Sequence, residues 1–456
     1  MLYYKVMRRD LLTILFIPML SILNVQAAEI VYPSSQNVKI NSPITAFIGN
    51  EKKHNNLTIN GEKVNIHPSG GFKHPVCLKY GENIFTISNG EEVKTYKITR
   101  NYTNNTNYDP PQTIYETPIA IITKNDNVPL RSTPVDAGLN RLQHLSQGIQ
   151  LKAIGEYKDF YKVQLSRDDY AWISKVNTEV CLDKINEESL LISSDHKIDS
   201  KEETFTFKLS SKLPYVLSEN NTGYDLVIYG LNEELYPFGR YELHIPANKK
   251  LGYSAKYNAD DELVIKIKNF TNNIKDLTIT LDPGHGGSER GTAGCLGDKE
   301  KDFNLKVAQM LESKLKALGA NVIMTRNSDK FVSLQDRVKI ANDNNSQIFI
   351  SIHANALPDT LLDKNITGTE IYYFYPQAKE LSQIILNSIN EKTGNTNGKI
   401  KAESFAVVRN TEAISILIEA GYMIDPEENS KLITQSYQDK ITDGIIKGIE
   451  RFLNGI

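Results

Sequence analysis

Two histidines and one glutamate each follow an apolar, β-branched run in the last part of the chain. His285 follows the run LTITLDPG, His353 follows IFISI, and Glu419 follows ISILI. Strands of one sheet that end at the same edge bring such side chains together, and ligands and catalysts are usually found at that edge. Imidazoles and carboxylates placed there are suited to binding a metal ion or to transferring protons.

Helical patterns separate these apolar runs. Apolar residues recur at helical spacing over 303–318, and Gly319 is suited to end that helix. Two more helices are expected near 377–392 and 437–453. The alternation of strands and helices predicts an α/β domain over 276–454, with a mostly parallel sheet covered by helices.

The residues before this domain predict three small all-β domains, because short alternating runs are separated by turns rich in Gly and Asn. A β-sandwich-like domain is expected over 29–101, and two more β domains are expected over 119–182 and 203–270. The polar segments between them, 102–118 and 183–202, predict linkers.

The second of these β domains resembles a bacterial SH3-like module. Its stretch NVPLRSTP, which begins at Asn127, and its stretch YAWI around Trp172 follow the layout of that module. PLR replaces the usual Val-Arg pair, and Tyr-Ala stands where Gly is expected before the tryptophan. The resemblance implies attachment to cell-wall peptide, whereas a core position for Trp172 is an equally good interpretation.

The amino terminus predicts a secretory signal peptide over residues 1–27. Lys5, Arg8 and Arg9 precede a mostly apolar segment that closes with the small residues of VQAA. The alternative, an uncleaved anchor, is disfavoured because the apolar run is short and contains polar residues. We expect cleavage after Ala27 and an exported protein of the periplasm, the cell wall or the extracellular space.

Charge and cysteine content exclude two classes of protein. Signal cleavage would remove three basic residues and one acidic residue, which changes the formal charge from -3 to -5. An acidic chain of this kind is not expected to bind nucleic acid. The three cysteines, Cys77, Cys181 and Cys295, are an odd number in separate segments, so we expect small buried side chains and no disulfide framework.

Six motifs after Leu277 occur together in a fixed order. They are DPGH with His285, EKDFNL from Glu300, TR at Thr325, LQDR with AN from Leu334, SIHAN with His353, and LIEAGY with Glu419. In combination they resemble the zinc N-acetylmuramoyl-L-alanine amidases of the family 3 type, over roughly residues 277–452.

The resemblance implies that His285, Glu300 and His353 bind one Zn²⁺ and that Glu419 is the catalytic carboxylate. Two imidazoles and one carboxylate leave a coordination position open, which is typical of hydrolytic rather than structural zinc sites. We also expect Asn355 and Arg409 to bind substrate.

Chemistry alone leaves two of these assignments open. Glu289, Asp298 and Asp302 lie close to Glu300 in sequence and offer the same ligand type. Glu419 is also able to pair with a cation such as Arg409 instead of acting on substrate.

The expected function is hydrolysis of the amide between N-acetylmuramic acid and L-alanine in peptidoglycan. The alternatives are a zinc peptidase that cuts within the stem peptide and a non-catalytic wall-binding protein. We expect a monomer that needs no obligate activator, because 354–367 and 375–407 are too short for a long helical plug. In the alternative interpretation, the 354–367 loop covers the site as a lid.

Overall fold

The computed structural model describes residues 28–455, except for 53–55, 102–110, 137, 248 and 250. The predicted signal peptide, residues 1–27, lies outside the described residues. Within the described part of the chain, no helix is both long and apolar enough to cross a membrane.

The first β unit consists of two sheets that face each other across a hydrophobic core containing Phe47, Phe72 and Phe85. One sheet has the order β1-β3-β6 and the other β2-β8-β7-β4-β5. The strands are β1 Glu29–Tyr32, β2 Asn37–Lys39, β3 Ile44–Asn50, β4 Thr58–Ile59, β5 Glu62–Lys63, β6 Gly71–Cys77, β7 Gly81–Ser88 and β8 Val93–Arg100.

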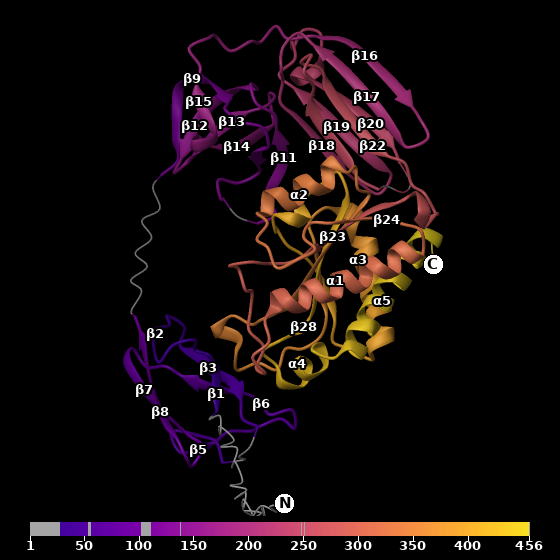
Figure 1. Ribbon diagram of the computed structural model, residues 1–456. Helices are drawn as coiled ribbons and strands as arrows, with labels where there is room; N and C mark the ends of the chain where they lie inside the picture. Colours follow the sequence, from indigo (N-terminus) through magenta and orange to yellow (C-terminus); the bar gives the residue numbers. More distant parts are fainter. Residues whose placement is uncertain are drawn as a thin grey trace, which may run out of the picture.

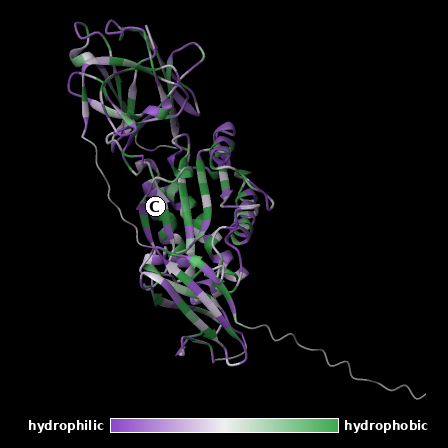
Figure 2. Ribbon diagram, turned by 90° about the vertical axis from the view of Figure 1, so that its left-hand side faces the viewer, coloured by the Kyte–Doolittle hydropathy of each residue, from purple (hydrophilic) through white to green (hydrophobic). Residues whose placement is uncertain are grey.

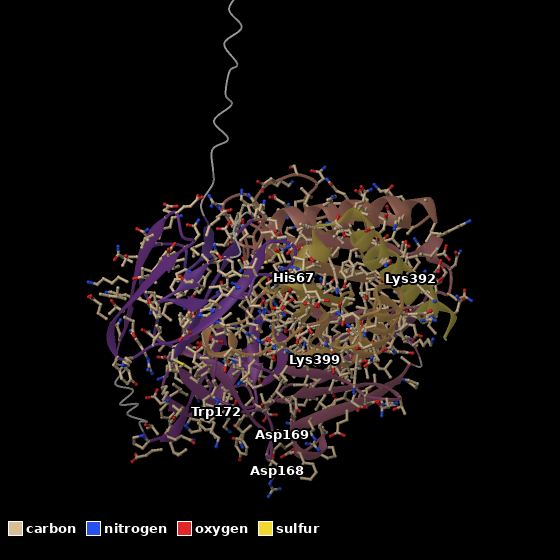
Figure 3. The ribbon with its side chains drawn as sticks, turned by 90° about the horizontal axis from the view of Figure 1, so that it is seen from below. His67, Asp168, Asp169, Trp172, Lys392 and Lys399 are labelled. Atoms are coloured by element: carbon tan, nitrogen blue, oxygen red, sulfur yellow. The ribbon has the colours of Figure 1, made fainter. Side chains whose placement is uncertain are left out.

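The second β unit is one sheet of seven strands in the order β11-β10-β14-β13-β12-β9-β15. Its strands are β9 Thr113–Thr123, β10 Val128–Arg131, β11 Arg141–Leu145, β12 Gln150–Tyr157, β13 Phe160–Gln164, β14 Tyr170–Ser174 and β15 Thr178–Val180. Trp172 is half-buried in β14 and lies away from His67 of the first unit (Figure 3).

The third β unit has two sheets, β16-β17-β22-β21 and β18-β19-β20. Its strands are β16 Leu191–Ile198, β17 Glu202–Leu209, β18 Tyr215–Glu219, β19 Gly223–Tyr229, β20 Arg240–Pro246, β21 Tyr253–Tyr257 and β22 Leu263–Lys268. Buried side chains of the second and third units form one continuous cluster, which includes Ile121, Leu151, Phe207 and Ile265. The two units therefore share a core, although the sequence predicts separate domains.

Both predicted linkers contain strand residues, so the linker predictions are wrong in part. Residues 113–118 belong to β9, and eight residues of the polar stretch 183–202 form the edge strand β16, which pairs with β17. An edge strand is stabilised by backbone hydrogen bonds and leaves side chains in water, so polar composition does not exclude it. The part of the first linker at 102–110 lies outside the described residues.

The α/β domain is built on a sheet of six strands in the order β24-β23-β25-β28-β26-β27. Its elements are β23 Thr278–Pro283, α1 Glu300–Ala317, β24 Asn321–Met324, α2 Leu334–Asp343, β25 Ile348–Asn355, β26 Glu370–Tyr373, α3 Lys379–Thr393, β27 Lys399–Ala402, β28 Ile414–Tyr422, α4 Pro426–Leu432 and α5 Gln435–Asn454. Short 3₁₀ turns include η4 Asp359–Leu361 and η6 Val407–Arg409.

The sheet is mixed rather than uniformly parallel. Strands β24, β23, β25 and β28 pair in parallel, whereas β26 is antiparallel to β28 and β27 follows the direction of β26. No long helix joins β25 to β26, so this connection lacks the usual element of a parallel crossover. Sequence alternation did not predict β27 or this reversal.

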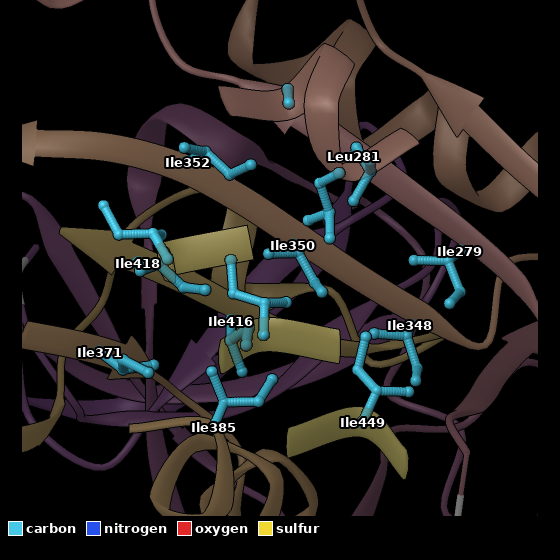
Figure 4. Packing of buried hydrophobic residues seen from close by; sticks show 14 of the residues in the cluster. Ile279, Leu281, Ile348, Ile350, Ile352, Ile371, Ile385, Ile416, Ile418 and Ile449 are labelled. Atoms are coloured by element: carbon cyan, nitrogen blue, oxygen red, sulfur yellow. The ribbon is translucent and has the colours of Figure 1, made fainter. Parts of the chain in front are cut away.

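Apolar side chains cover both faces of the sheet. On one face, α1, α3 and α5 pack on the strands, and Figure 4 shows Ile416 beside Ile385 of α3 and Ile348 beside Ile449 of α5. On the other face, α2 and η6 pack on a smaller cluster that includes Phe349 and Leu417. The hydrophobic central strands stand out in Figure 2. Every second residue of β25 therefore faces a different helical layer, which explains its nearly continuous apolar run.

The β units lie at opposite ends of the α/β domain (Figure 1). The first unit contacts the domain through α4 and η4, and the second and third units lie at the other end. The predicted burial of cysteines holds for Cys295, whereas Cys77 is exposed and Cys181 is half-buried.

Candidate active site

Three neighbouring strands bring His285, His353 and Glu419 to one end of the sheet. The parallel register of β23 and β25 pairs Pro283 with Ile352, and that of β25 and β28 pairs His353 directly with Glu419. The convergence predicted from the three apolar runs is therefore present in the structure.

A network of buried charges holds the turn that carries His285. Arg337 Nη1 donates to Asp282 Oδ1 at 2.7 Å, and Arg337 Nη2 donates to the backbone oxygen of His285 at 2.8 Å. Arg326 donates to the backbone oxygen of Gly284 at 2.9 Å. His285 itself has a φ of 59°, a left-handed conformation that is uncommon for a residue other than glycine. The network therefore holds the imidazole in a backbone geometry that the turn would not favour alone.

Two glycines allow the backbone to pack directly against the candidate ligands. A Cβ at Gly284 would lie 2.1 Å from Cε1 of His353, and a Cβ at Gly291 would lie 2.4 Å from Oε2 of Glu300. Both distances are far shorter than van der Waals contact. Any other residue at either position would displace a candidate ligand.

Glu300 lies between the two histidines. Its Oε1 atom is 2.8 Å from Nδ1 of His353 and 3.1 Å from Nε2 of His285, and the three ligand atoms lie within 4.8 Å of one another. The backbone N–H of Thr292 donates to Oε2 of Glu300 at 2.8 Å. Although burial acts to raise it, hydrogen bonds from His285 and His353 hold the pKa of Glu300 below its ordinary value. The carboxylate is therefore charged and oriented as a metal ligand requires.

This geometry separates Glu300 from the nearby acids that sequence chemistry leaves open. Among the described residues, the metal-binding group contains His285, Glu300 and His353 and none of the other three acids. Asp298 instead accepts hydrogen bonds from Asn429. Two imidazole nitrogens and one carboxylate oxygen fit a zinc ion by their chemistry.

Glu419 is half-buried beside this group. One of its carboxylate oxygens, Oε2, has no hydrogen-bond partner among the described residues. Burial raises the pKa of Glu419 to about 7, with His353 acting against the shift and the charges of Glu300 and Glu370 adding to it. A carboxyl group with a pKa near neutrality is suited to accepting and returning a proton.

Glu370, which the sequence did not single out, faces Glu419 from the next strand. The two residues are paired in the register of β26 and β28. Lys401 Nζ donates to Glu370 at 2.8 Å, and the hydroxyl of Tyr372 donates to the same carboxylate. The only available signal was a glutamate at the start of a short predicted strand. That signal is weak because it does not reveal which strand lies alongside.

The two predicted substrate residues lie in different places. Asn355 ends β25 beside the candidate site, and its side chain is 3.5 Å from Glu370 Oε2. Arg409 lies in η6, which precedes β28 and is therefore at the opposite end of the sheet from His353. Its guanidinium donates to the backbone oxygen of Ser404 and lies near Arg141 of the second β unit. The pairing of Arg409 with Glu419 that the sequence left open is absent from the described contacts.

Comparison with known proteins relates the α/β domain to one family. The family model described as N-acetylmuramoyl-L-alanine amidase matches residues 279–451. A protein of Staphylococcus saprophyticus named "Probable cell wall amidase LytH" is 32% identical over 209 residues, which cover 45% of this chain and 69% of that protein. The chain belongs to the N-acetylmuramoyl-L-alanine amidase family. This confirms the family predicted from the motifs.

Other relatives and solved structures match part of the chain. A protein of Staphylococcus epidermidis, also named "Probable cell wall amidase LytH", is 35% identical over 186 residues and is covered over 61% of its length, against 40% of this chain. The chain thus spans about three fifths of that relative. The catalytic domain of CwlV, an N-acetylmuramoyl-L-alanine amidase from Bacillus (Paenibacillus) polymyxa var. colistinus, is 32% identical, with 98% of that chain and 39% of this one covered and a TM-score of 0.37.

Proposed function

We propose that this chain hydrolyses the amide between N-acetylmuramic acid and L-alanine in peptidoglycan. The observation that supports it most is the group His285, Glu300 and His353 beside the half-buried Glu419, in a member of the amidase family. A decayed wall-binding protein would have no need to keep this set.

We propose that His285, Glu300 and His353 hold one Zn²⁺. When bound there, zinc would supply a Lewis acid that polarises the amide carbonyl and makes water more acidic. Glu419 would take the proton of the attacking water and deliver it to the leaving amine. Its unpartnered oxygen leaves room for that proton.

We also propose that the mature chain acts as a monomer in the cell envelope or outside the cell, without a second protein. The name of the staphylococcal relatives supports the location. The span between β26 and β28 holds η5 Pro376–Ala378, α3, β27 and η6 with short turns, which leaves no room for a long insert that covers the site. The SH3-like second unit would contribute attachment to the wall.

The test is analysis of products by mass spectrometry after residues 28–456 act on purified peptidoglycan. Intact stem peptides that begin with alanine and unbroken glycan strands are expected. Cuts within the stem peptide would instead identify a peptidase, and new reducing ends would identify a glycosidase. If activity required an added protein, the proposal that the chain needs no activator would be wrong.

A further inference from the structure

A pocket of about 290 Å³ lies where the first β unit meets the α/β domain. Strand β1 and the turn after it contribute Glu29, Val31 and Ser34 to its wall. The loop that precedes α1 contributes Arg290, Gly291 and Lys299. The pocket therefore belongs to neither unit alone.

This pocket adjoins the proposed metal site. Gly291, which lines it, packs on the carboxylate of Glu300 and on the ring of His285. The next residue, Thr292, also lines the pocket and donates its backbone N–H to Glu300. A group bound in the pocket would thus lie beside the loop that packs on the proposed metal ligands.

The first β unit is fixed to the rim of the site by hydrogen bonds. Tyr32 Oη donates to Asp359 at 2.7 Å, and Thr45 Oγ1 donates to the same carboxylate at 2.8 Å. Asp359 lies in the loop that follows the ligand strand β25. Asn50 Nδ2 donates to the backbone oxygen of Cys295 at 3.2 Å, in the loop before α1. The first unit thereby contacts both loops that lead to or from the ligands.

Apolar packing reinforces this contact. Ala46 and Ile48 of β3 are buried in one cluster with Cys295, Leu362 and Ile424 of the α/β domain. Gly71 also lies against Cys295, since a Cβ there would be 2.7 Å from its sulfur. Buried apolar contact of this kind stabilises the first unit against the α/β domain.

The charge of the pocket points to an anionic ligand group. Arg290 and Lys299 are both exposed, and neither forms an ion pair with any residue that the structure describes. Glu29, across the pocket, receives a hydrogen bond from Asn50 at 3.2 Å. Two unpaired cations beside one engaged carboxylate suit a ligand carboxylate, which an arginine binds with two parallel hydrogen bonds.

We propose that this pocket binds a free carboxylate of the peptidoglycan stem peptide and that the first β unit forms its outer wall. The inference rests on the proposed amidase function and assigns part of its substrate specificity to residues 29–34. Arg290 and Lys299 bind the carboxylate, and β1 limits the size of the group that enters.

The experiment measures kcat and KM of residues 28–456 on two soluble muropeptides that differ only in a stem-peptide carboxylate, free in one and amidated in the other. The variant Arg290→Ala/Lys299→Ala is expected to raise KM about tenfold for the free acid and not for the amide, with kcat unchanged, since a charge-assisted hydrogen bond is lost. Ser34→Trp, which fills the pocket from the first unit, is expected to raise KM for both substrates. Lys306→Ala, an exposed lysine of α1 outside the pocket, is the matched control.

Each outcome decides between the two proposals. Equal KM values of the double variant and the wild type on the free acid would overturn this inference, while the wild type still releases stem peptides. An unchanged KM in Ser34→Trp would overturn the role of the first unit as a wall. A wild type that releases no stem peptide from either substrate would overturn the amidase proposal itself and this inference with it. The zinc content of every variant is measured in parallel, because a loss of metal would reveal an indirect effect.

Discussion

Two titratable side chains with shifted pKa values, Glu419 and Lys268, lie at opposite ends of the α/β sheet and differ in their hydrogen bonding. At the carboxyl end of β28, the half-buried Glu419 has one buried oxygen, Oε2, without a hydrogen-bond partner among the described residues. At the amino end, Lys268 of the third β unit is buried, and its ammonium donates to the backbone oxygens of Ser346 and Glu412 at 2.7 and 2.6 Å. Burial lowers the pKa of Lys268 to about 8. Desolvation shifts the pKa of both groups, but only Glu419 has a buried polar atom without a described hydrogen-bond partner.

This difference distinguishes the end of the sheet suited to catalysis from the end that contacts the second and third β units. Buried polar groups in folded proteins almost always find partners, so an unpartnered carboxylate marks a place where the fold keeps a group free for another purpose. At the amino end, Tyr253 N–H donates to the backbone oxygen of Thr411 at 2.7 Å, and the N–H of Gln377 donates to Glu219 at the same distance. That end docks the second and third units. The carboxyl end holds the groups suited to catalysis.

The largest expected effect comes from a candidate ligand at the carboxyl end. His353→Ala removes one of three ligands, so zinc affinity should fall by at least about 100-fold and turnover should become undetectable. Metal content after dialysis and release of stem peptides measure both. Retention of full activity would show that His353 is not a zinc ligand.

Among these substitutions, the largest loss of stability is expected from breaking the buried ion pair below the site. Arg337 and Asp282 are 2.7 Å apart and are 2% and 1% exposed. Arg337→Ala leaves the carboxylate uncompensated and should lower the free energy of unfolding by about 3–5 kcal/mol, measured with denaturant. The exposed pair of Lys339 and Asp343 on α2 supplies the control, since Lys339→Ala should cost less than about 1 kcal/mol.

The raised pKa of Glu419 should make the stability of the metal-free protein depend on pH. The folded state retains a proton on Glu419 up to about pH 7, whereas an unfolded glutamate loses it near its ordinary pKa of 4.5. The stability contributed by the protonated group is therefore lost as pH rises between these values. Relative to Glu419→Gln, the wild type should lose about 2 kcal/mol between pH 5 and pH 8. A difference between the two proteins that stays constant with pH would show that Glu419 is already ionised.

The smallest effect is expected at the amino end. Burial and the neighbouring charge of Arg141 lower the pKa of the Arg409 guanidinium, and the side chain lies far along the sheet from the ligands. Arg409→Ala should change kcat/KM less than about twofold and stability by less than about 1 kcal/mol. A KM raised tenfold would restore the substrate role that the sequence assigned to it.

The sequence predicted the strands, helices and main residues of the site better than it predicted which strands and units lie next to one another. His285, His353 and Glu419 were found because each follows a buried strand, and strand ends in a parallel sheet must converge. Glu300 was found through the family pattern and not through chemistry, since several acids lie beside it. The helices were found from their spacing, because periodicity is a local property.

The missed features depend on long-range pairing. Glu370 gains its position from an antiparallel strand that local patterns do not orient. Arg409 precedes the strand whose carboxyl end carries Glu419, so it lies at the opposite end of the sheet, and its neighbour there, Arg141, belongs to a β unit far away in sequence. The contact of the first β unit with the ligand loops joins residues such as Tyr32 and Asp359, which no periodicity connects.

The division of roles between the ligands and Glu419 is the central claim, and one measurement tests it most directly. Zinc content and turnover are determined on the same sample of Glu419→Gln, with His353→Ala beside it. The account predicts that Glu419→Gln binds one zinc per chain and loses about 100-fold to 10,000-fold in kcat, because the ligands remain while the proton carrier is lost. Loss of zinc in Glu419→Gln equal to that in His353→Ala would contradict the account and make Glu419 a ligand.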